Sequence, residues 1–220
     1  MHTLQDLKTL FANEYGETSA PADTDTTVPT RTRYINIARE DIVGRRKWAW
    51  RKKSGALTTN GTNVLSISQT DFHEDGIVED TFQIDGEDWT QIDESEATYY
   101  ASNSRIFCVR GDATGWEFYF PQSIPDTGLA VTFRYWRGAG ELADNADQDF
   151  IPFKEPIASL AVGKYIQGEG DYDEALPFLE KAEAMIDEKK ASDKRSRGKR
   201  RFRDGNTQRG YNVHDVTTMY

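Results

Sequence analysis

The chain has 220 residues, of which 37% are hydrophobic and 29% charged, so it can bury a sizeable core in one or two domains. We expect no membrane segment, because no run approaches the roughly 20 apolar residues that a spanning helix needs. We also expect no secretory signal, because residues 1–6 lack a basic and an apolar region. The single cysteine, Cys108, excludes an intramolecular disulfide and suits a protein made in a reducing cytoplasm.

The net charge of −10 is unevenly distributed along the chain. Residues 1–188 hold 17 Lys and Arg against 34 Asp and Glu, whereas residues 189–220 hold 10 Lys and Arg against 3 Asp. Residues 54–104 contain 11 acidic residues and no Lys or Arg. Such a body repels nucleic acid, while a basic tail is typical of a chain with a charged partner. Alternatively, the acidic residues of 54–104 have no partner role and simply lie on the solvent-exposed surface of β-strands.

Two helices are predicted in the first part of the chain. Residues 3–15 can be capped by Thr3 and carry one apolar face, formed by Leu4, Leu7, Leu10 and Phe11. Residues 16–30 are a predicted loop. A second helix is expected from near Thr32 to near Arg46, with its charged residues, Arg39 included, facing away from the apolar stripe of Tyr34, Ile37, Ala38 and Ile42.

The middle of the chain, from Trp48 to about Trp136, favours β structure. Short β-rich runs are separated by turn residues; they are 64–67, 105–109, 116–120 and 129–136. Asn60-Gly61 is a hairpin-turn signal. Several short strands at this spacing predict a compact β-sandwich or barrel.

Helical periodicity returns after Asp149. One helix carries Ile157, Leu160, Ala161 and Tyr165 and ends at Gly168-Glu169-Gly170, and a second amphipathic helix follows to about residue 190. Either Asp171 or Asp173 can cap the second helix. We favour Asp173, because Asp171 would place Pro177 inside the helix. The short connection predicts an antiparallel pair.

The predicted fold class is therefore α+β. Residues 1–47 and 150–190 would form a discontinuous antiparallel helical bundle, because both helical pairs must bury their apolar stripes. Residues 48–149 would form an inserted small β-sandwich or barrel domain. Residues 191–220 would be an extended basic C-terminal arm.

No constellation of catalytic, cofactor-binding or metal-ligating residues is predicted. His2, His73 and His214 are far apart in the sequence, and Asp144, Asp147 and Asp149 lack the spacing of a calcium loop. A loop that caps the following helix is the better interpretation of these three. Cys108 lies in an apolar alternating run, which favours a buried structural cysteine over a nucleophile. We expect a protein that is not an enzyme and needs no cofactor.

The basic arm is the sharpest single feature. Nine Lys and Arg between residues 189 and 203 stand against Asp193 alone, so the arm lacks the apolar content to fold by itself and should be mobile in a free subunit. It could be a solvated tail, a nucleic-acid contact, or a docking arm for an acidic protein groove. In the docking interpretation, the contacts are charge-assisted bonds and small apolar anchors, made by Arg195, Arg197, Arg200, Arg201, Arg203, Tyr211, Met219 and Tyr220.

Three segments together resemble the head-to-tail adaptor (connector) family of tailed bacteriophages, which includes the tail tubular protein A of short-tailed phages. The first, Tyr34 to Trp50, is similar to the family's long helix leading into an aromatic pair. The second, Trp116 to Pro121 followed by Val131 to Arg137, is similar to its last β-hairpin. The third, Asp149 to Lys190, is similar to its acidic loop and final helical pair.

The resemblance implies a structural virion protein that is assembled in the host cytoplasm. It would form a homo-oligomeric ring of twelve subunits below the portal protein and above a tail tube or nozzle protein. Genomic DNA would pass through the lumen without specific binding, and no membrane would be involved. C-terminal extensions of the family reach into clefts between portal subunits, which favours the docking interpretation of the arm.

Two other functions remain open at this point. A nucleic-acid-binding protein would use the basic arm and bind DNA in a salt-sensitive way as a monomer. A different tail or fibre-attachment component would show another ring order or a trimer.

Overall fold

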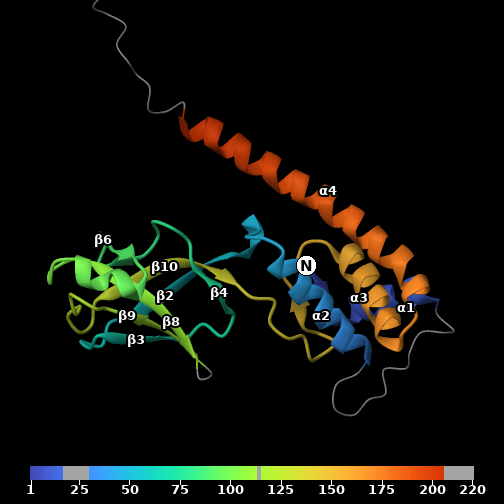
Figure 1. The fold of residues 1–220 in the computed structure, drawn as a ribbon, viewed down its shortest axis with the longest axis horizontal. Helices are drawn as coiled ribbons and strands as arrows, with labels where there is room; N and C mark the ends of the chain where they lie inside the picture. The colour runs from blue at the N-terminus through green and yellow to red at the C-terminus, as the bar shows by residue number, and fades with distance from the viewer. Residues whose placement is uncertain (17–29, 113–114, 206–220) are drawn as a thin grey trace, which may run out of the picture.

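The computed structural model describes residues 1–16, 30–112 and 115–205, with Asp112 and residues 195–205 described by their backbone only. Figure 1 shows two lobes side by side along the long axis, one built of helices and one of strands, with a single long helix that rises from the helical lobe and ends above the β lobe. The predicted α+β class is confirmed. The predicted loop at 16–30 falls almost wholly outside the described residues.

The helical lobe combines the two ends of the chain. Its helices are α1 (Leu4–Tyr15), α2 (Thr30–Gly44), α3 (Lys154–Glu169) and α4 (Tyr172–Gly205). Their apolar residues form one buried cluster that draws on all four helices and includes Leu7, Ile42, Leu160, Ala182 and Ile186. Burial of such side chains contributes roughly 1.5–3 kcal/mol each, so helices more than 100 residues apart in the sequence depend on one another.

The first helix begins as the sequence predicts. The Thr3 hydroxyl accepts a hydrogen bond from the Asp6 amide at 3.2 Å, and the Asp6 carboxylate accepts one from the Thr3 amide at 2.8 Å. This reciprocal pair satisfies two amides that have no partner inside the helix. Directly before it, β1 (His2–Thr3) pairs with β11 (Gln148–Asp149), which ties the start of the chain to the segment that precedes α3.

The buried face of α2 differs from the predicted stripe. Ile35, Ala38 and Ile42 are fully buried, whereas Tyr34 and Ile37 are only partly so. The prediction that Arg39 faces away is wrong, because its side chain is 1% exposed. Compared with the prediction, α2 is rotated about its axis, so that the Arg39 guanidinium lies in the interior and contacts buried polar groups.

The turn between α3 and α4 corrects the predicted cap. Gly170 adopts the left-handed conformation, with φ of 96°, and the Asp171 amide donates to the Ile166 carbonyl at 3.3 Å. This tight turn leaves Asp171, not Asp173, before the first turn of α4, where its carboxylate accepts from the Glu174 amide at 3.1 Å. Pro177 therefore lies inside the helix, which forgoes one backbone hydrogen bond there.

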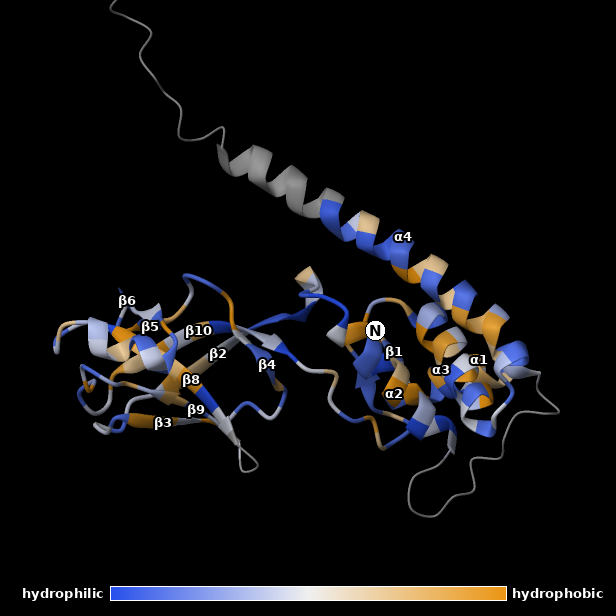
Figure 2. Ribbon diagram, viewed as in Figure 1, coloured by the Kyte–Doolittle hydropathy of each residue, from blue (hydrophilic) through white to orange (hydrophobic). Residues whose placement is uncertain are grey.

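The last helix is longer than predicted. We expected an extended arm from residue 191, but α4 continues to Gly205. An established helix adds each further residue at little cost, and Lys, Arg and Ala are strong helix formers. Figure 2 shows the hydrophobic residues of α4 in its earlier turns and hydrophilic ones further along. The helix thus runs past the apolar cluster that holds its first half.

Two sheets make up the β lobe. One contains β2 (Lys52–Thr58), β10 (Ala130–Arg137), β5 (Gln83–Ile84) and β6 (Glu87–Asp88) in that order, with β4 (Phe72–Ile77) also paired to β10. The other contains β3 (Val64–Ile67), β9 (Gly115–Tyr119), β8 (Ile106–Asp112) and β7 (Thr90–Gln91). Short 3₁₀ turns occur at η1 (Ala49–Arg51) and η2 (Glu94–Tyr99).

The strand pairing overturns two predicted hairpins. β2 and β3 flank Asn60-Gly61 but belong to different sheets, and so do β9 and β10. Thr59, directly after β2, connects to the residues directly before β10. Its carbonyl accepts from the Gly128 amide at 2.9 Å, and its hydroxyl accepts from the Leu129 amide at 2.8 Å. A Gly-containing turn permits a reversal, but cross-strand pairing decides whether a hairpin forms.

An aromatic cluster joins the two sheets. Phe118 from one sheet contacts Phe133 from the other edge to face, at 5.1 Å between ring centroids, and Phe82 stacks on Phe107 at 4.0 Å. These rings belong to a buried cluster separate from that of the helices. Each lobe therefore has its own hydrophobic interior.

Gly163 provides a test of the helix packing. A β-carbon on this residue would lie 2.6 Å from Cδ2 and 2.8 Å from Cγ of Leu179, and 3.3 Å from its backbone nitrogen. We expect Gly163→Ala to lower the free energy of unfolding by about 1–3 kcal/mol, because α3 and α4 cannot stay in contact without a shift.

Urea-induced unfolding followed by circular dichroism would measure this change. Gly44→Ala is the matched control, because a β-carbon there meets nothing within 4 Å, and a gain of up to about 1 kcal/mol is expected from helix propensity. Equal stability of the two variants would contradict the close packing.

Candidate functional site: a buried polar joint and the surfaces it positions

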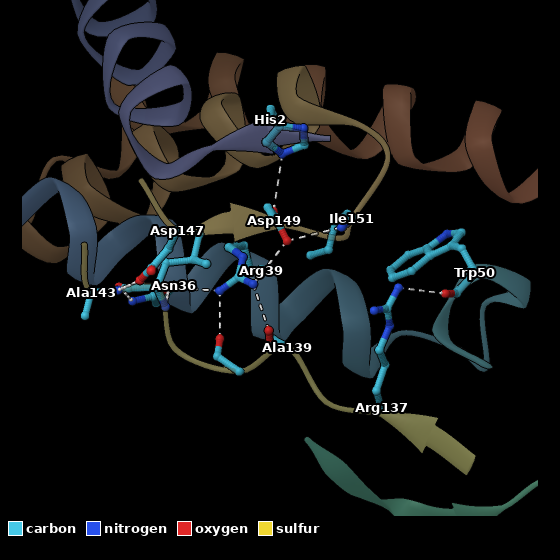
Figure 3. Close-up of polar contacts among 12 residues, drawn as sticks. His2, Asn36, Arg39, Trp50, Arg137, Ala139, Ala143, Asp147, Asp149 and Ile151 are labelled. Atoms are coloured by element: carbon cyan, nitrogen blue, oxygen red, sulfur yellow. Dashed lines mark hydrogen bonds and ion pairs between the residues drawn. The ribbon is translucent and has the colours of Figure 1, made fainter. Parts of the chain in front are cut away.

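A buried arginine of α2 organises the connection between the lobes (Figure 3). Arg39 Nη1 donates to the Gly140 carbonyl at 2.7 Å, and Nη2 donates to the Ala139 carbonyl at 2.7 Å. Nη2 also forms an ion pair with Asp149 Oδ1 at 3.1 Å. A single planar guanidinium thus holds both the segment that follows β10 and the segment that precedes α3.

Asn36, one helical turn before Arg39, completes this arrangement. Its side-chain amide donates to the Leu142 carbonyl at 3.0 Å, while its Oδ1 accepts from the Leu142 amide at 3.1 Å. Asp147 accepts from the amides of Ala143 and Asp144, both at 2.8 Å. The segment at residues 139–149 has little regular structure, so these side chains supply the partners that its backbone needs.

The carboxylate of Asp149 is wholly buried, and each of its oxygens has a polar neighbour. It accepts from the Ile151 amide at 3.1 Å, and His2 Nε2 lies 3.3 Å from its second oxygen. Burial alone would raise the pKa of Asp149, but the bonds from His2 and Arg39 outweigh it, so the pKa lies below its ordinary value. The carboxylate stays ionised, and the N-terminal residues are bound to the same joint.

Asp149 does not cap the helix that follows it. The N-cap of α3 is Phe153, without a side-chain hydrogen bond. The prediction of a helix-capping acidic loop is therefore wrong, since the carboxylate turns to the buried guanidinium instead.

Two further arginines, Arg51 and Arg137, connect the strands to the end of α2. Arg51 Nη1 donates to the Val43 carbonyl at 2.9 Å and pairs with Asp75 at 2.7 Å, and its Nε donates to the Arg137 carbonyl at 2.9 Å. Arg137 in turn donates to the Trp50 carbonyl at 3.2 Å and lies 3.6 Å from the ring centroid of Phe150. Burial lowers the pKa of both guanidinium groups from a very high ordinary value, which leaves them charged.

The long helix is attached to the same region. Arg46 pairs with Asp193 at 3.0 Å and donates to the Lys190 carbonyl at 3.3 Å. Arg45 pairs with Glu183, which lies ten residues before Asp193 on α4, at 2.5 Å. These are the contacts that guide α4 past the helical lobe, and its residues 194–205 continue beyond them.

The residues predicted for the docking arm fall into two groups. Arg195, Arg197, Arg200, Arg201 and Arg203 belong to the helical backbone of α4, and their side chains are not described. Tyr211, Met219 and Tyr220 lie outside the described residues. The structure therefore gives the first group a helical setting and leaves all of their contacts as predictions.

A groove of about 890 Å³ crosses the β lobe. Carboxylates surround it, namely Asp75, Glu79, Asp80, Asp93, Glu94 and Glu96, while Lys47 and Lys52 line it beside Trp136. Its floor is apolar and includes Phe82, Trp89, Ile92, Phe107 and Val109. We call this the acidic groove. Cys108 also lines it but is only 2% exposed, and burial raises the pKa of its thiol; the predicted buried cysteine is confirmed.

No group of three or more His, Cys, Asp or Glu side chains that could hold a metal ion occurs among the described residues. Within residues 1–16, 30–112 and 115–205, no helix combines the length and apolar character needed to cross a membrane.

Comparison with known proteins identifies one family. The family model described as SU10 adaptor protein matches residues 2–207, which is nearly the whole chain. No curated protein matches the sequence significantly.

The Arg39–Asp149 pair yields a prediction about stability. Asp149→Asn should lower the free energy of unfolding by about 3–5 kcal/mol at pH 7, because it leaves a buried guanidinium without its counter-charge. The exposed Asp144 provides the matched control as Asp144→Asn, for which a change within about 0.5 kcal/mol is expected.

The pH dependence of the difference identifies the carboxylate as its source. The lowered pKa of folded Asp149 means that its contribution is complete above the unfolded value of about 3.9 and is lost as the pH falls through the folded value. Urea denaturation at several pH values should show wild type and Asp149→Asn converging below about pH 4. A difference that stays constant down to pH 2 would contradict the assignment.

Proposed function

The chain belongs to the SU10 adaptor protein family, and from this we propose that it forms the head-to-tail adaptor ring of a tailed phage. Family membership makes it a structural adaptor protein of the phage virion and confirms the resemblance to head-to-tail adaptors. The proposal adds a ring of twelve subunits, bound to the portal on one side and to a tail tube or nozzle protein on the other. It also assigns the chain no catalytic role and no cofactor.

The two-lobed structure supports a division into domains. We propose that residues 1–47 and 150–190 form one domain and residues 48–149 an inserted sandwich-like domain, with a C-terminal arm from residue 191. The separate buried clusters of the two lobes support this. The joint at Arg39, Arg51 and Arg137 supports a fixed angle between them, which a ring subunit needs in order to repeat the same contacts.

The charge of the body supports passage of DNA without binding. The acidic stretch 54–104 carries carboxylates that lie on the surface, namely Glu74, Glu79, Asp80, Asp85, Glu87, Asp88, Asp93, Glu94 and Glu96. A negatively charged lumen does not bind phosphates, so DNA can slide through it.

The observation that carries the proposal is the projection of α4. The helix leaves its last described contacts at Asp193 and continues for twelve residues to Gly205, which is roughly 18 Å at 1.5 Å per residue. This part of the chain carries a dense set of Lys and Arg, whereas the rest of the chain is acidic. We propose that this arm, from Arg195 to Tyr220, docks on the portal.

The second candidate function is DNA binding by the same arm. The excess of ten Lys and Arg over three Asp in residues 189–220 favours it, since such an excess is the footprint of phosphate contact. It predicts that the isolated subunit binds DNA and loses affinity steeply as salt is raised. A tail or fibre-attachment role would instead give a stable, discrete trimer of the free protein.

A truncation after Lys194 tests the docking role. It keeps Asp193 and Lys190, so the described contacts of α4 remain. We expect an unchanged melting temperature and loss of stable binding to purified portal, measured by co-sedimentation. The matched control replaces Arg33, Arg134 and Lys154 by Gln, which removes exposed positive charge outside the arm.

DNA binding by gel shift, measured on the same variants, separates the two functions. Portal binding retained by the truncated chain, with DNA binding lost, would assign the arm to nucleic acid and refute the docking role.

A further inference from the structure

We propose that the acidic groove of each subunit receives the basic end of α4 from the neighbouring copy of this chain. The inference rests on the proposed ring, and it names the contact that holds adjacent subunits together. The helical part of the arm, residues 195–205, would lie between the neighbour's β lobe and the portal, so the portal docking proposed above is retained. The groove is lined by six carboxylates and two lysines, and residues 189–203 carry nine Lys and Arg, so the groove and the arm have charges of opposite sign.

The groove is formed by segments that meet only in the folded protein. Glu79 and Asp80 follow β4, Asp93 and Glu96 belong to the segment around η2, and the floor includes Phe107 and Val109 of β8. A space of about 890 Å³ is of the size that accepts several side chains of a partner.

The charges of the groove fit a cationic segment. Six carboxylates line it against two lysines, and the Lys52 ammonium already lies 5.0 Å from the ring centroid of Trp136. Asp75 is engaged by Arg51 and Glu94 by Arg110, whereas Glu79, Asp80 and Glu96 are exposed at the rim. The apolar floor can accept the aliphatic stems of Lys and Arg while the rim binds their charged ends.

The direction of α4 favours a neighbour over the subunit's own groove. Arg46 holds Asp193 and the Lys190 carbonyl, and the helix then continues without a turn to Gly205. In Figure 1 its end lies above the β lobe and stands clear of the strands, without bending back towards them. The twelve helical residues after Asp193 span roughly 18 Å, so the end of the helix projects well past the contacts that hold it to its own subunit.

Such a contact has the form that closes rings. A projection on one face and a groove on another make a heterologous interface, which repeats head to tail around an axis. It also offsets the repulsion between bodies that each carry 17 more acidic than basic residues. Because the contact is electrostatic, its strength should fall as ionic strength rises.

Charge reversal in the groove tests the inference on the full chain. The groove variant combines Glu79→Lys, Asp80→Lys and Glu96→Lys. The matched control combines Glu74→Lys, Glu141→Lys and Asp144→Lys, three exposed carboxylates outside the groove that give the same change in net charge. Melting temperatures confirm that both variants fold before assembly is measured.

The readout is cross-linking from the arm. A photoreactive benzoylphenylalanine replaces Arg197, and a mixture of isotopically heavy and light chains is assembled on purified portal. We expect heavy-to-light cross-links between position 197 and the segment 79–96. They should fall at least about tenfold in the groove variant, the change that a loss of 1.4 kcal/mol gives, and stay unchanged in the control.

Different results overturn different proposals. Wild-type rings on the portal with cross-links confined to one chain, or with no loss in the groove variant, would refute the neighbour contact and leave the adaptor ring standing. Failure of the wild-type chain to assemble on the portal would refute the ring, and the neighbour contact with it.

Discussion

The buried guanidinium of Arg39 is the interaction on which the other parts of the structure depend. It donates to two backbone carbonyls of the segment after β10 and pairs with Asp149, which His2 also contacts. A buried charge is costly unless it is paired and hydrogen-bonded, and the two terminal nitrogens of Arg39 supply these contacts. The position of α2 therefore fixes the course of residues 139–149, and with it the point at which the chain returns to the helical lobe.

The joint explains how two separate hydrophobic interiors act as one subunit. Arg51 and Arg137 extend the polar contacts to the strands, and they bind the end of α2 and the Trp50 backbone. Hydrophobic contacts resist separation but specify little about angle, whereas several directed hydrogen bonds fix orientation. Trp48 and Trp50 stack beside them, at 5.6 Å between ring centroids, which adds apolar contact to the joint.

The distribution of charge links this geometry to assembly. The acidic carboxylates lie on the β lobe, and the basic residues follow one another along the end of α4. Because Arg46 and Asp193 orient that helix, the joint determines where the positive end is presented relative to the acidic groove. In the adaptor ring proposed above, such separation would allow one surface to repel phosphate while another binds protein.

Local patterns in the sequence determined much of the secondary structure. The capping box at Thr3, the strand Val64–Ile67 and the alternation in Ala130–Arg137 depend on near neighbours, as do helix periodicity and turn preference. The acidic body and the basic tail are properties of composition and needed no structure.

Tertiary structure decided what depends on distant partners. The pairing of β9 with β3 and β8, in place of β10, follows from which sheet buries each face. Arg39 and Asp149 gave no local signal of burial, because a charged residue enters an interior only where a partner 110 positions away meets it. The acidic groove likewise exists only because β4, η2 and β8 come together, and the length of α4 was decided by elongation from a helix that packing had already anchored.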